Sequence, residues 1–331
     1  MKPYVIAELG ANAGSSLNRA LALVAAAANA GCDAIKLQTY TPDCMTLDEP
    51  YFAKGLWQGR TLYELYAEAQ TPWDWHPHIF DRARELGLDC ISTPFSFGAV
   101  DYLTGLGVDA FKVASFEANW LELISYIGSK KKPVYISTGM ASSAEITEAW
   151  RAVVVASLGE VKPTMLCCLS EYPARAENMH LANIPDLKRI MPVVRVGLSD
   201  HTLGHEAAVL AVALGAEVIE KHLCLSRADG GPDAEFSAEP QEMKALVEAC
   251  HRAAAIIGRP AYGEREGENA YYRRSLIATR DIGVGELVTM GNVGVLRPNI
   301  GLPPGALDEV LGLKATQPVR KGEGLQWHHL R

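Results

Sequence analysis

The chain has 331 residues, of which 48% are hydrophobic and 21% charged, and its formal net charge is −8 at pH 7. This length allows a large core and more than one domain, and the composition is that of a soluble globular protein. The acidic balance argues against binding to nucleic acid or a membrane surface, although a local cluster of lysines can still bind an anionic substrate.

The N-terminus carries no visible secretory signal, because Met1–Tyr4 runs directly into the strand-like Val5–Glu8. The Ala-rich run at residues 20–28 is too short to span a bilayer. The seven cysteines show no metal-type spacing, and we interpret them as reduced thiols of a cytoplasmic protein.

Residues 1 to about 260 alternate strand-like and helix-like segments. Each expected strand is a short, nearly continuous apolar run, which is typical of strands buried on both faces. These strands are Tyr4–Leu9, Ala34–Thr39, Asp89–Pro94, Ala110–Ser115, Pro133–Thr138, Thr164–Ser170, Val194–Asp200 and Glu217–Leu223. The segments between them include Leu17–Ala30, Pro72–Leu86, Ser142–Leu158 and Gly204–Leu214. Eight such units predict an α/β fold, a (β/α)8 TIM barrel, which needs roughly 250 residues.

Two loops of this barrel are candidates to cover a site. The interval Tyr40–Tyr63 is long for its position and contains several Pro and Gly residues, and Asp229–Asp233 follows the last strand. A cluster of aromatic side chains could bind a sugar face, but we favour a role in packing a helix against its preceding loop; it consists of Trp57, Trp73, Trp75, His76 and His78.

The composition changes after the barrel. We predict a linker at residues 261–274 and a small β-rich domain at residues 275–331, with strand-like pieces at 275–279, 286–288 and 293–296 and a short helix near Leu307–Leu311. A domain of about 57 residues is marginal by itself, so we expect it to pack on the barrel or on another subunit.

His201 and His222 stand 21 residues apart, each at the end of an apolar run, with one helix-length segment between them. This spacing predicts two imidazoles at the same end of neighbouring parallel strands, which are roughly 5 Å apart. Such a pair favours an open metal site of unspecified element over two satisfied core histidines. Asp200 either orients His201 as a neighbour or is a surface carboxylate.

The strand ends also carry lysines and hydroxyls. Lys36 and Lys112 lie inside apolar runs, and Thr93, Ser115, Ser137 and Ser199 end other strands. Because lysine is rarely buried without a partner, we predict a site for phosphate or carboxylate. The alternative is a buried Lys–Glu pair with structural hydroxyls.

Two carboxylates are further candidate site residues. Glu8, at the end of the first strand, could act as a base, bind the metal or orient water, or it could pair with Lys36 or Lys112. Asp233, after Gly-Gly-Pro, could accept a bond from a sugar hydroxyl or could serve only the turn.

Together, these segments resemble the sialic acid synthase family. The resemblance is carried by Ile6–Glu8, Ile35–Thr39, Ser92–Ser96, Lys112–Ser115, Ser137–Met140, Gly197–His201 and Glu220–His222, in this order. The C-terminal part, with Arg280–Ile282, Arg297-Pro298 and Gly301-Leu302, resembles the family's antifreeze-like (SAF) domain. Three stretches are most similar to the pseudaminic branch of the family, namely Gln38–Asp43, Gly55–Tyr66 and Ala114–Asn119.

The resemblance implies condensation of phosphoenolpyruvate with an amino-sugar aldehyde, which releases phosphate. It implies that His201 and His222 hold Mn²⁺ or Mg²⁺ and that Glu8 is the catalytic carboxylate. It assigns phosphoenolpyruvate to Lys36, Thr93, Lys112, Ser115, Ser137 and Ser199, and the sugar to Gln38, Tyr172 and Asp233. Arg297 is expected to reach the sugar's N-acetyl group in the partner subunit, which implies a domain-swapped homodimer.

The sequence departs from the family pattern at two places. Ala13 follows Asn12 where the family commonly has His, and Ser170-Glu171 stands where the sialic acid branch often has Asn-Ile. Two other functions remain open on the residues alone: a Schiff-base aldolase that uses Lys36 or Lys112, and a non-catalytic carbohydrate- or ice-binding protein.

Overall fold

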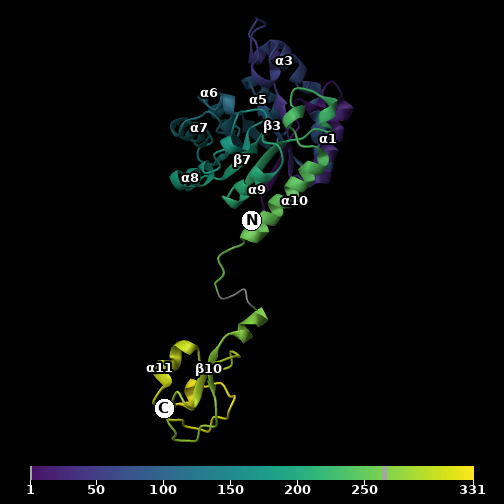
Figure 1. Cartoon of the computed structure of the whole chain (residues 1–331). Helices are drawn as coiled ribbons and strands as arrows, with labels where there is room; N and C mark the ends of the chain where they lie inside the picture. The colour runs from purple at the N-terminus through teal and green to yellow at the C-terminus, as the bar shows by residue number, and fades with distance from the viewer. Residues whose placement is uncertain (1, 263–266) are drawn as a thin grey trace. The chain divides into compact units, whose positions relative to one another are not determined.

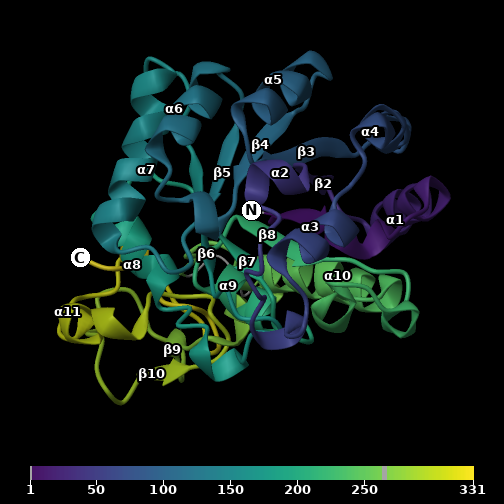
Figure 2. The same ribbon diagram turned by 90° about the horizontal axis from the view of Figure 1, so that it is seen from above.

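In the computed structural model, which describes residues 2–262 and 267–331, eight parallel strands form a closed barrel in which β1 also pairs with β8. Figure 2 shows the strands near the centre with helices such as α1, α5, α7 and α10 around them. The strands are β1 Tyr4–Glu8, β2 Ala34–Thr39, β3 Asp89–Pro94, β4 Ala110–Val113, β5 Val134–Ser137, β6 Thr164–Cys168, β7 Val196–Asp200 and β8 Val218–His222. The predicted TIM barrel is therefore confirmed.

The helices of the barrel follow the expected alternation with the strands. They are α1 Leu17–Ala30, α2 Pro42–Met45, α3 Leu62–Ala69, α4 His76–Glu85, α5 Phe97–Gly105, α6 Leu121–Ser129, α7 Ser143–Ala156, α8 Asn183–Ile190, α9 Glu206–Ala213 and α10 Pro240–Ile257. No helix in the described part of the chain is long and apolar enough to cross a membrane.

Some predicted boundaries were wrong by a few residues. Helix α1 has the predicted bounds, because the Ser16 side chain caps its first turn and Gly31 ends it at a φ of 84°. The predicted helix Pro72–Leu86 begins only at His76, since Trp73–Trp75 forms a separate 3-10 turn. Likewise β4 ends at Val113, because Ser115–Glu117 turns into a 3-10 helix.

The side chains inside the barrel change from apolar to polar along each strand. One layer is apolar and consists of Ile6, Ala34, Ile91, Ala110, Tyr135, Leu166 and Val218. Two residues further along the same strands stand Glu8, Lys36, Thr93, Lys112, Ser137, Cys168 and Glu220. Since side chains two residues apart point to the same face of a strand, the second layer is a polar floor at the C-terminal end of the barrel.

The structure divides into two compact units, Met1–Gly258 and Arg259–Arg331 (Figure 1). In the second unit, β9 Ser275–Ala278 pairs antiparallel with β10 Val293–Leu296, and α11 spans Leu307–Val310. Its core contains Leu276, Val288, Val293, Val310 and Leu325 among other apolar side chains.

Two details of this unit differ from the prediction. The strand-like piece at residues 286–288 forms an isolated bridge from Leu287 to Lys314 and exchanges backbone hydrogen bonds with residues 312–315, but it does not join the two-stranded sheet of β9 and β10. Residues 263–266 of the predicted linker lie outside the described residues, and Gly267–Tyr272 forms a 3-10 helix.

Candidate active site

A buried cluster of two lysines and two glutamates forms the polar floor of the barrel. Lys36 contacts Glu8 and lies 3.7 Å from Glu220, and the Lys112 ammonium lies 4.0 Å from Glu220. All four side chains are at most 6% exposed. The pairing of Lys36 with Glu8 is the arrangement that the sequence left open as an alternative to an anion site.

The hydroxyls predicted for an anion site join this cluster. Lys112 donates to the Ser137 hydroxyl over 2.7 Å, and Ser199 donates to Glu220 over 3.0 Å. Lys36 lies 3.4 Å from the Thr93 hydroxyl. The Ser115 hydroxyl accepts a bond from the backbone N–H of Gly139 instead. Ammonium and hydroxyl donors thus lie close together in this cluster. A bound anion could accept their hydrogen bonds in place of the glutamates.

Burial sets different proton affinities within this cluster. It raises the pKa of Glu8, against the opposing pull of Lys36. The pKa of Glu220 is lowered, because Lys112 and Lys36 together outweigh the effect of its own burial. Burial lowers the pKa of Lys112, whereas the carboxylates of Glu220 and Glu8 raise that of Lys36 despite its burial. Of the two carboxyls, Glu8 therefore takes up a proton more readily than Glu220.

His201 and His222 lie beside this cluster with their ring centroids 5.6 Å apart. The Nδ1–H group of His201 donates a hydrogen bond to the carbonyl oxygen of Leu169 over 3.0 Å, so Nε2 is the ring nitrogen that could bind a cation. Burial and the nearby positive charges, with His201 foremost among them, hold the pKa of His222 well below its ordinary value, so this ring is neutral at pH 7. Burial lowers the pKa of His201, but Cys168 and the Leu169 carbonyl outweigh burial and raise it. In their deprotonated forms, two such imidazoles are suitable ligands for a divalent cation.

The surroundings of His222 fit such a cation. Its Nδ1 atom is buried without a hydrogen-bond partner and lies 3.5 Å from the Asp233 carboxylate. A Cβ atom at Gly10 would lie 2.2 Å from that carboxylate and 3.2 Å from the ring, so only glycine allows this approach. The residues that the structure describes include no group of three His, Cys, Asp or Glu side chains placed to hold a metal ion. A cation held by the two histidines would therefore complete its shell with water or substrate oxygens.

The interpretation of Asp200 as a surface carboxylate was wrong. Asp200 is 1% exposed, so it is not a surface carboxylate, and it bonds to Lys221 and Thr202 rather than to the His201 ring. The reason is the alternation of the strand: Ser199 points into the barrel, so Asp200 points out of it.

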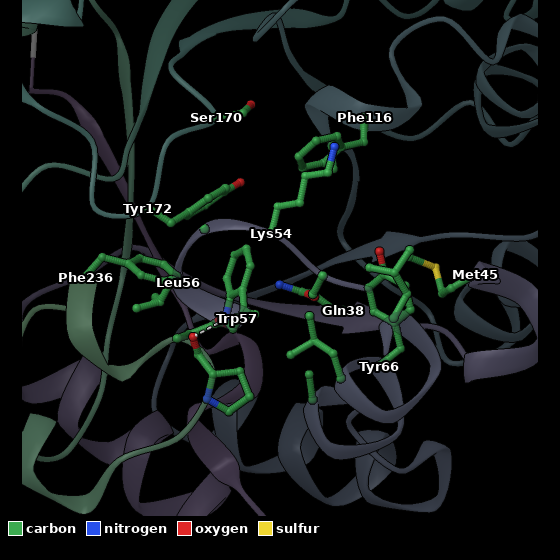
Figure 3. Close-up of a pocket in the computed structure, with 18 of the residues that line it drawn as sticks. Gln38, Met45, Lys54, Leu56, Trp57, Tyr66, Phe116, Ser170, Tyr172 and Phe236 are labelled. Atoms are coloured by element: carbon green, nitrogen blue, oxygen red, sulfur yellow. Dashed lines mark hydrogen bonds between the residues drawn. The ribbon is translucent and has the colours of Figure 1, made fainter. Parts of the chain in front are cut away.

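A cavity of about 770 Å³ opens beside His222. Its lining includes Gln38, Tyr172 and Asp233, the three residues predicted to contact a sugar, together with His222. Figure 3 shows Gln38 and Tyr172 on different sides of this space, with Trp57 and Phe236 beside it. Gln38 also donates to Glu8 over 3.2 Å, which connects the cavity to the charged cluster.

Aromatic rings form one wall of the cavity. The Tyr172 ring lies 4.5 Å from His201, 5.0 Å from Phe236 and 5.3 Å from Trp57, measured between centroids. Trp57 reaches this wall from the long loop after β2 and donates its indole N–H to the carbonyl of Pro232 over 2.8 Å (Figure 3). The favoured packing role fits Trp73, which stacks on Tyr102, whereas Trp57 packs on Tyr172 and also lines the cavity.

Two other predicted features belong to different units of the structure. Arg297 is exposed and belongs to the C-terminal unit, directly after β10. Ala13, where a histidine was expected, is 6% exposed and packs in the apolar core around the barrel.

Sequence reasoning missed two cavity residues that carry charge. Glu117 lies in the 3-10 turn after β4, and its Oε2 atom is buried without a hydrogen-bond partner. Burial raises the pKa of this carboxyl to about 7. Lys54 lines the cavity from the loop that carries Trp57. The position of Glu117 directly after a buried strand could have indicated a site residue. The stretch Ala114–Asn119, which contains it, entered the sequence analysis only through its similarity to one branch of the family.

Comparison with known proteins assigns the chain to a family. A model of the NeuB family matches residues 23–262, and a model of the SAF domain matches residues 273–331. The pseudaminic acid synthase of Campylobacter jejuni is 42% identical over 333 residues, covering 98% of this chain and 96% of the relative. That of Helicobacter pylori is 38% identical and covers 95% and 94%.

A solved structure agrees in fold. The N-acetylneuraminic acid synthetase of Leptospira borgpetersenii, solved in complex with citrate, matches with a TM-score of 0.73 at 30% identity, covering 81% of this chain and 90% of that one. The family model covers most of the chain, and the relatives match nearly all of it. The chain therefore belongs to the NeuB family and carries a SAF domain at residues 273–331.

Proposed function

We propose that this chain condenses phosphoenolpyruvate with 2,4-diacetamido-2,4,6-trideoxy-β-L-altrose to give pseudaminic acid and phosphate. One observation carries the reaction type: two imidazoles lie beside a buried cluster of lysines and hydroxyls, and His222 and Gln38 connect this cluster to one cavity. A condensation of this kind needs both an activated carbonyl and a held phosphate. The choice of sugar rests on the pseudaminic acid synthases at 38–42% identity.

Each part of the site has a role in this proposal. A divalent cation, Mn²⁺ or Mg²⁺, held by His201 and His222 would supply a Lewis acid for the aldehyde of the open-chain sugar. Phosphoenolpyruvate is held by Lys36, Lys112 and the hydroxyls of Thr93, Ser115, Ser137 and Ser199, which stabilise charge on its phosphate and carboxylate. Gln38, Tyr172 and Asp233 contact the sugar.

The bond changes follow from this arrangement. The methylene carbon of phosphoenolpyruvate attacks the aldehyde carbon, which forms the new carbon–carbon bond. Water, positioned by Glu8, then adds to the resulting cation at C2. The tetrahedral intermediate expels phosphate by cleavage of the carbon–oxygen bond.

The proposal extends to the assembly and the compartment. We place Arg297 of one copy at the N-acetyl group of the sugar bound in the partner copy, in a domain-swapped homodimer. All seven cysteines are free thiols, which supports a reducing compartment such as the cytoplasm.

Mass spectrometry of the products tests the substrate. The enzyme is given phosphoenolpyruvate with N-acetylmannosamine or with either of the two diacetamido-trideoxy precursors, those of pseudaminic and legionaminic acid. We expect product and phosphate only with the altrose derivative. Exclusive use of N-acetylmannosamine would overturn the assignment, and exclusive use of the third sugar would make the chain a legionaminic acid synthase, which is the name of relatives at 31–33% identity.

Metal removal and trapping test the chemistry. Treatment with a chelator should abolish turnover and added Mn²⁺ should restore it, whereas full activity of metal-free protein contradicts the role of the histidines. Borohydride trapping of a sugar adduct on Lys36 or Lys112 would favour a Schiff-base aldolase instead. Measurable sugar binding without turnover of any of the three sugars would favour a non-catalytic protein.

A further inference from the structure

Lys221 and Asp200 form a buried ion pair on the outer side of the barrel, behind the two histidines. Their charged atoms are 2.8 Å apart, and each residue is 1% exposed. Each is also the immediate chain neighbour of a histidine, since Asp200 precedes His201 and Lys221 precedes His222. The pair therefore links the ends of β7 and β8 at the point where both imidazoles leave the backbone.

The contacts of the pair enclose the backbone of His201. Asp200 accepts bonds from the backbone N–H and the hydroxyl of Thr202, at 2.9 and 2.8 Å. Lys221 also donates to the carbonyl oxygen of Thr202. Lys221 thus contacts both chain neighbours of His201, namely Asp200 and Thr202. The carbonyl oxygen of His201 accepts a hydrogen bond from the backbone N–H of Ala174 over 2.9 Å. These bonds fix the turn that presents the His201 ring toward His222.

Stability alone does not explain such a pair. Taking two charges out of water costs several kcal/mol each, and replacing a buried pair with apolar side chains is often neutral or stabilising. Placement of metal ligands does explain it, because partners behind the ligands set ring position, and their loss typically weakens metal binding about 10- to 100-fold.

We infer that Lys221 and Asp200 are positioning residues that hold His201 and His222 at the separation needed to bind a divalent cation. This inference rests on the proposed metal role of the histidines. It assigns no contact with the cation or substrate to either residue.

The test measures Mn²⁺ binding to metal-free full-length protein by calorimetry, so no turnover is needed. The double variant Lys221→Met/Asp200→Leu removes both charges together and leaves neither buried alone. We expect a melting temperature close to that of the unsubstituted protein and a Kd for Mn²⁺ raised about tenfold or more. The variant Lys188→Met is a control, because Lys188 pairs over 3.1 Å with Glu217, which lies at the opposite end of β8. Its Kd should not change.

The outcomes separate this inference from the proposed function. If the unsubstituted protein does not bind Mn²⁺, both fail. If it binds Mn²⁺ and the folded double variant binds equally well, only the positioning role fails. If the double variant does not fold, Asp200→Asn decides, because its amide nitrogen cannot accept the bond from Lys221 while its oxygen can keep the Thr202 contacts. An unchanged Kd in that variant overturns the inference.

Discussion

Glu8 connects the charged cluster to the cavity. Its Oε1 atom accepts bonds from the Gly10 N–H at 2.8 Å and from Gln38 at 3.2 Å, and its Oε2 atom contacts Lys36. No other carboxylate described in the site contacts both a residue assigned to the sugar and a lysine assigned to phosphoenolpyruvate. Its charge therefore matters to both substrates.

Replacement of Glu8 with Gln should separate turnover from binding. The amide keeps the shape of the side chain but cannot position water as a carboxylate does, so kcat should fall by roughly 100-fold or more. The Kd for phosphoenolpyruvate should stay constant or decrease, because a negative charge next to Lys36 is gone. Phosphate release and calorimetry measure the two effects. The exposed Glu160→Gln serves as a control, and a kcat within threefold of the original would contradict the role of Glu8.

Glu117 should make stability depend on pH. Its pKa is raised from 4.5 to about 7 by burial, so the folded state favours the protonated form. Its stabilising contribution is complete below pH 4.5 and is lost as the pH rises toward 7. Glu117→Gln should therefore gain stability relative to the original protein between pH 5 and 8, by up to about 3 kcal/mol, since a tenfold change in proton affinity is worth about 1.4 kcal/mol. Urea unfolding at pH 5 and pH 8 measures the free energy of unfolding of both proteins. A difference between variant and original that is the same at both pH values contradicts the prediction.

At the scale of elements, a hairpin in the loop after β2 forms part of the cavity wall. Phe52 and Thr61 form an antiparallel bridge, and Ala53 donates its N–H to the Arg60 carbonyl over 2.9 Å. The tip carries Trp57 to Pro232 in the loop after β8. Two loops at distant positions in the sequence are thus joined beside the cavity.

Substitution of Trp57 with Phe tests this contact between the two loops. The phenyl ring can keep the contact with Tyr172, but the hydrogen bond to Pro232 is lost, which is worth about 1 kcal/mol. We expect the KM for the sugar to rise up to about fivefold, with little change for phosphoenolpyruvate, and Trp57→Ala to have a larger effect. Trp150→Phe in α7 is the matched control. Equal effects on both substrates would show that the hairpin does not act on the sugar alone.

The sequence predicted the strands and the polar floor because both follow from local patterns. Continuous apolar runs mark the strands, and Lys36 and Lys112 inside such runs signal a buried polar layer. The contact between Trp57 and Pro232 could not be predicted, since nothing local fixes how loops 175 residues apart meet. The ion pair of Asp200 with Lys221 could not be predicted for another reason: the sequence does not show which outward-facing side chains of neighbouring strands meet.

At the scale of the whole molecule, the chain consists of a barrel that carries the candidate active site and a small C-terminal unit that carries Arg297. The C-terminal unit has its own apolar core, formed by residues such as Leu276, Ile282 and Val310. Arg297 is exposed on this unit, so its guanidinium is accessible to a ligand or to another surface. In the proposed domain-swapped dimer, each site consists of the barrel of one copy and Arg297 of the other.

Mixing two inactive variants distinguishes a swapped site from a site within one copy. Glu8→Gln inactivates the barrel, and Arg297→Ala removes the arginine. In a swapped dimer formed by coexpression at equal amounts, half of the dimers contain one copy of each variant. One site of each mixed dimer combines both defects, and the other combines an intact barrel with an intact Arg297. A quarter of all sites should therefore recover, and phosphate release should approach about one quarter of the original activity. If Arg297 serves its own barrel, every site keeps one defect and mixing restores nothing.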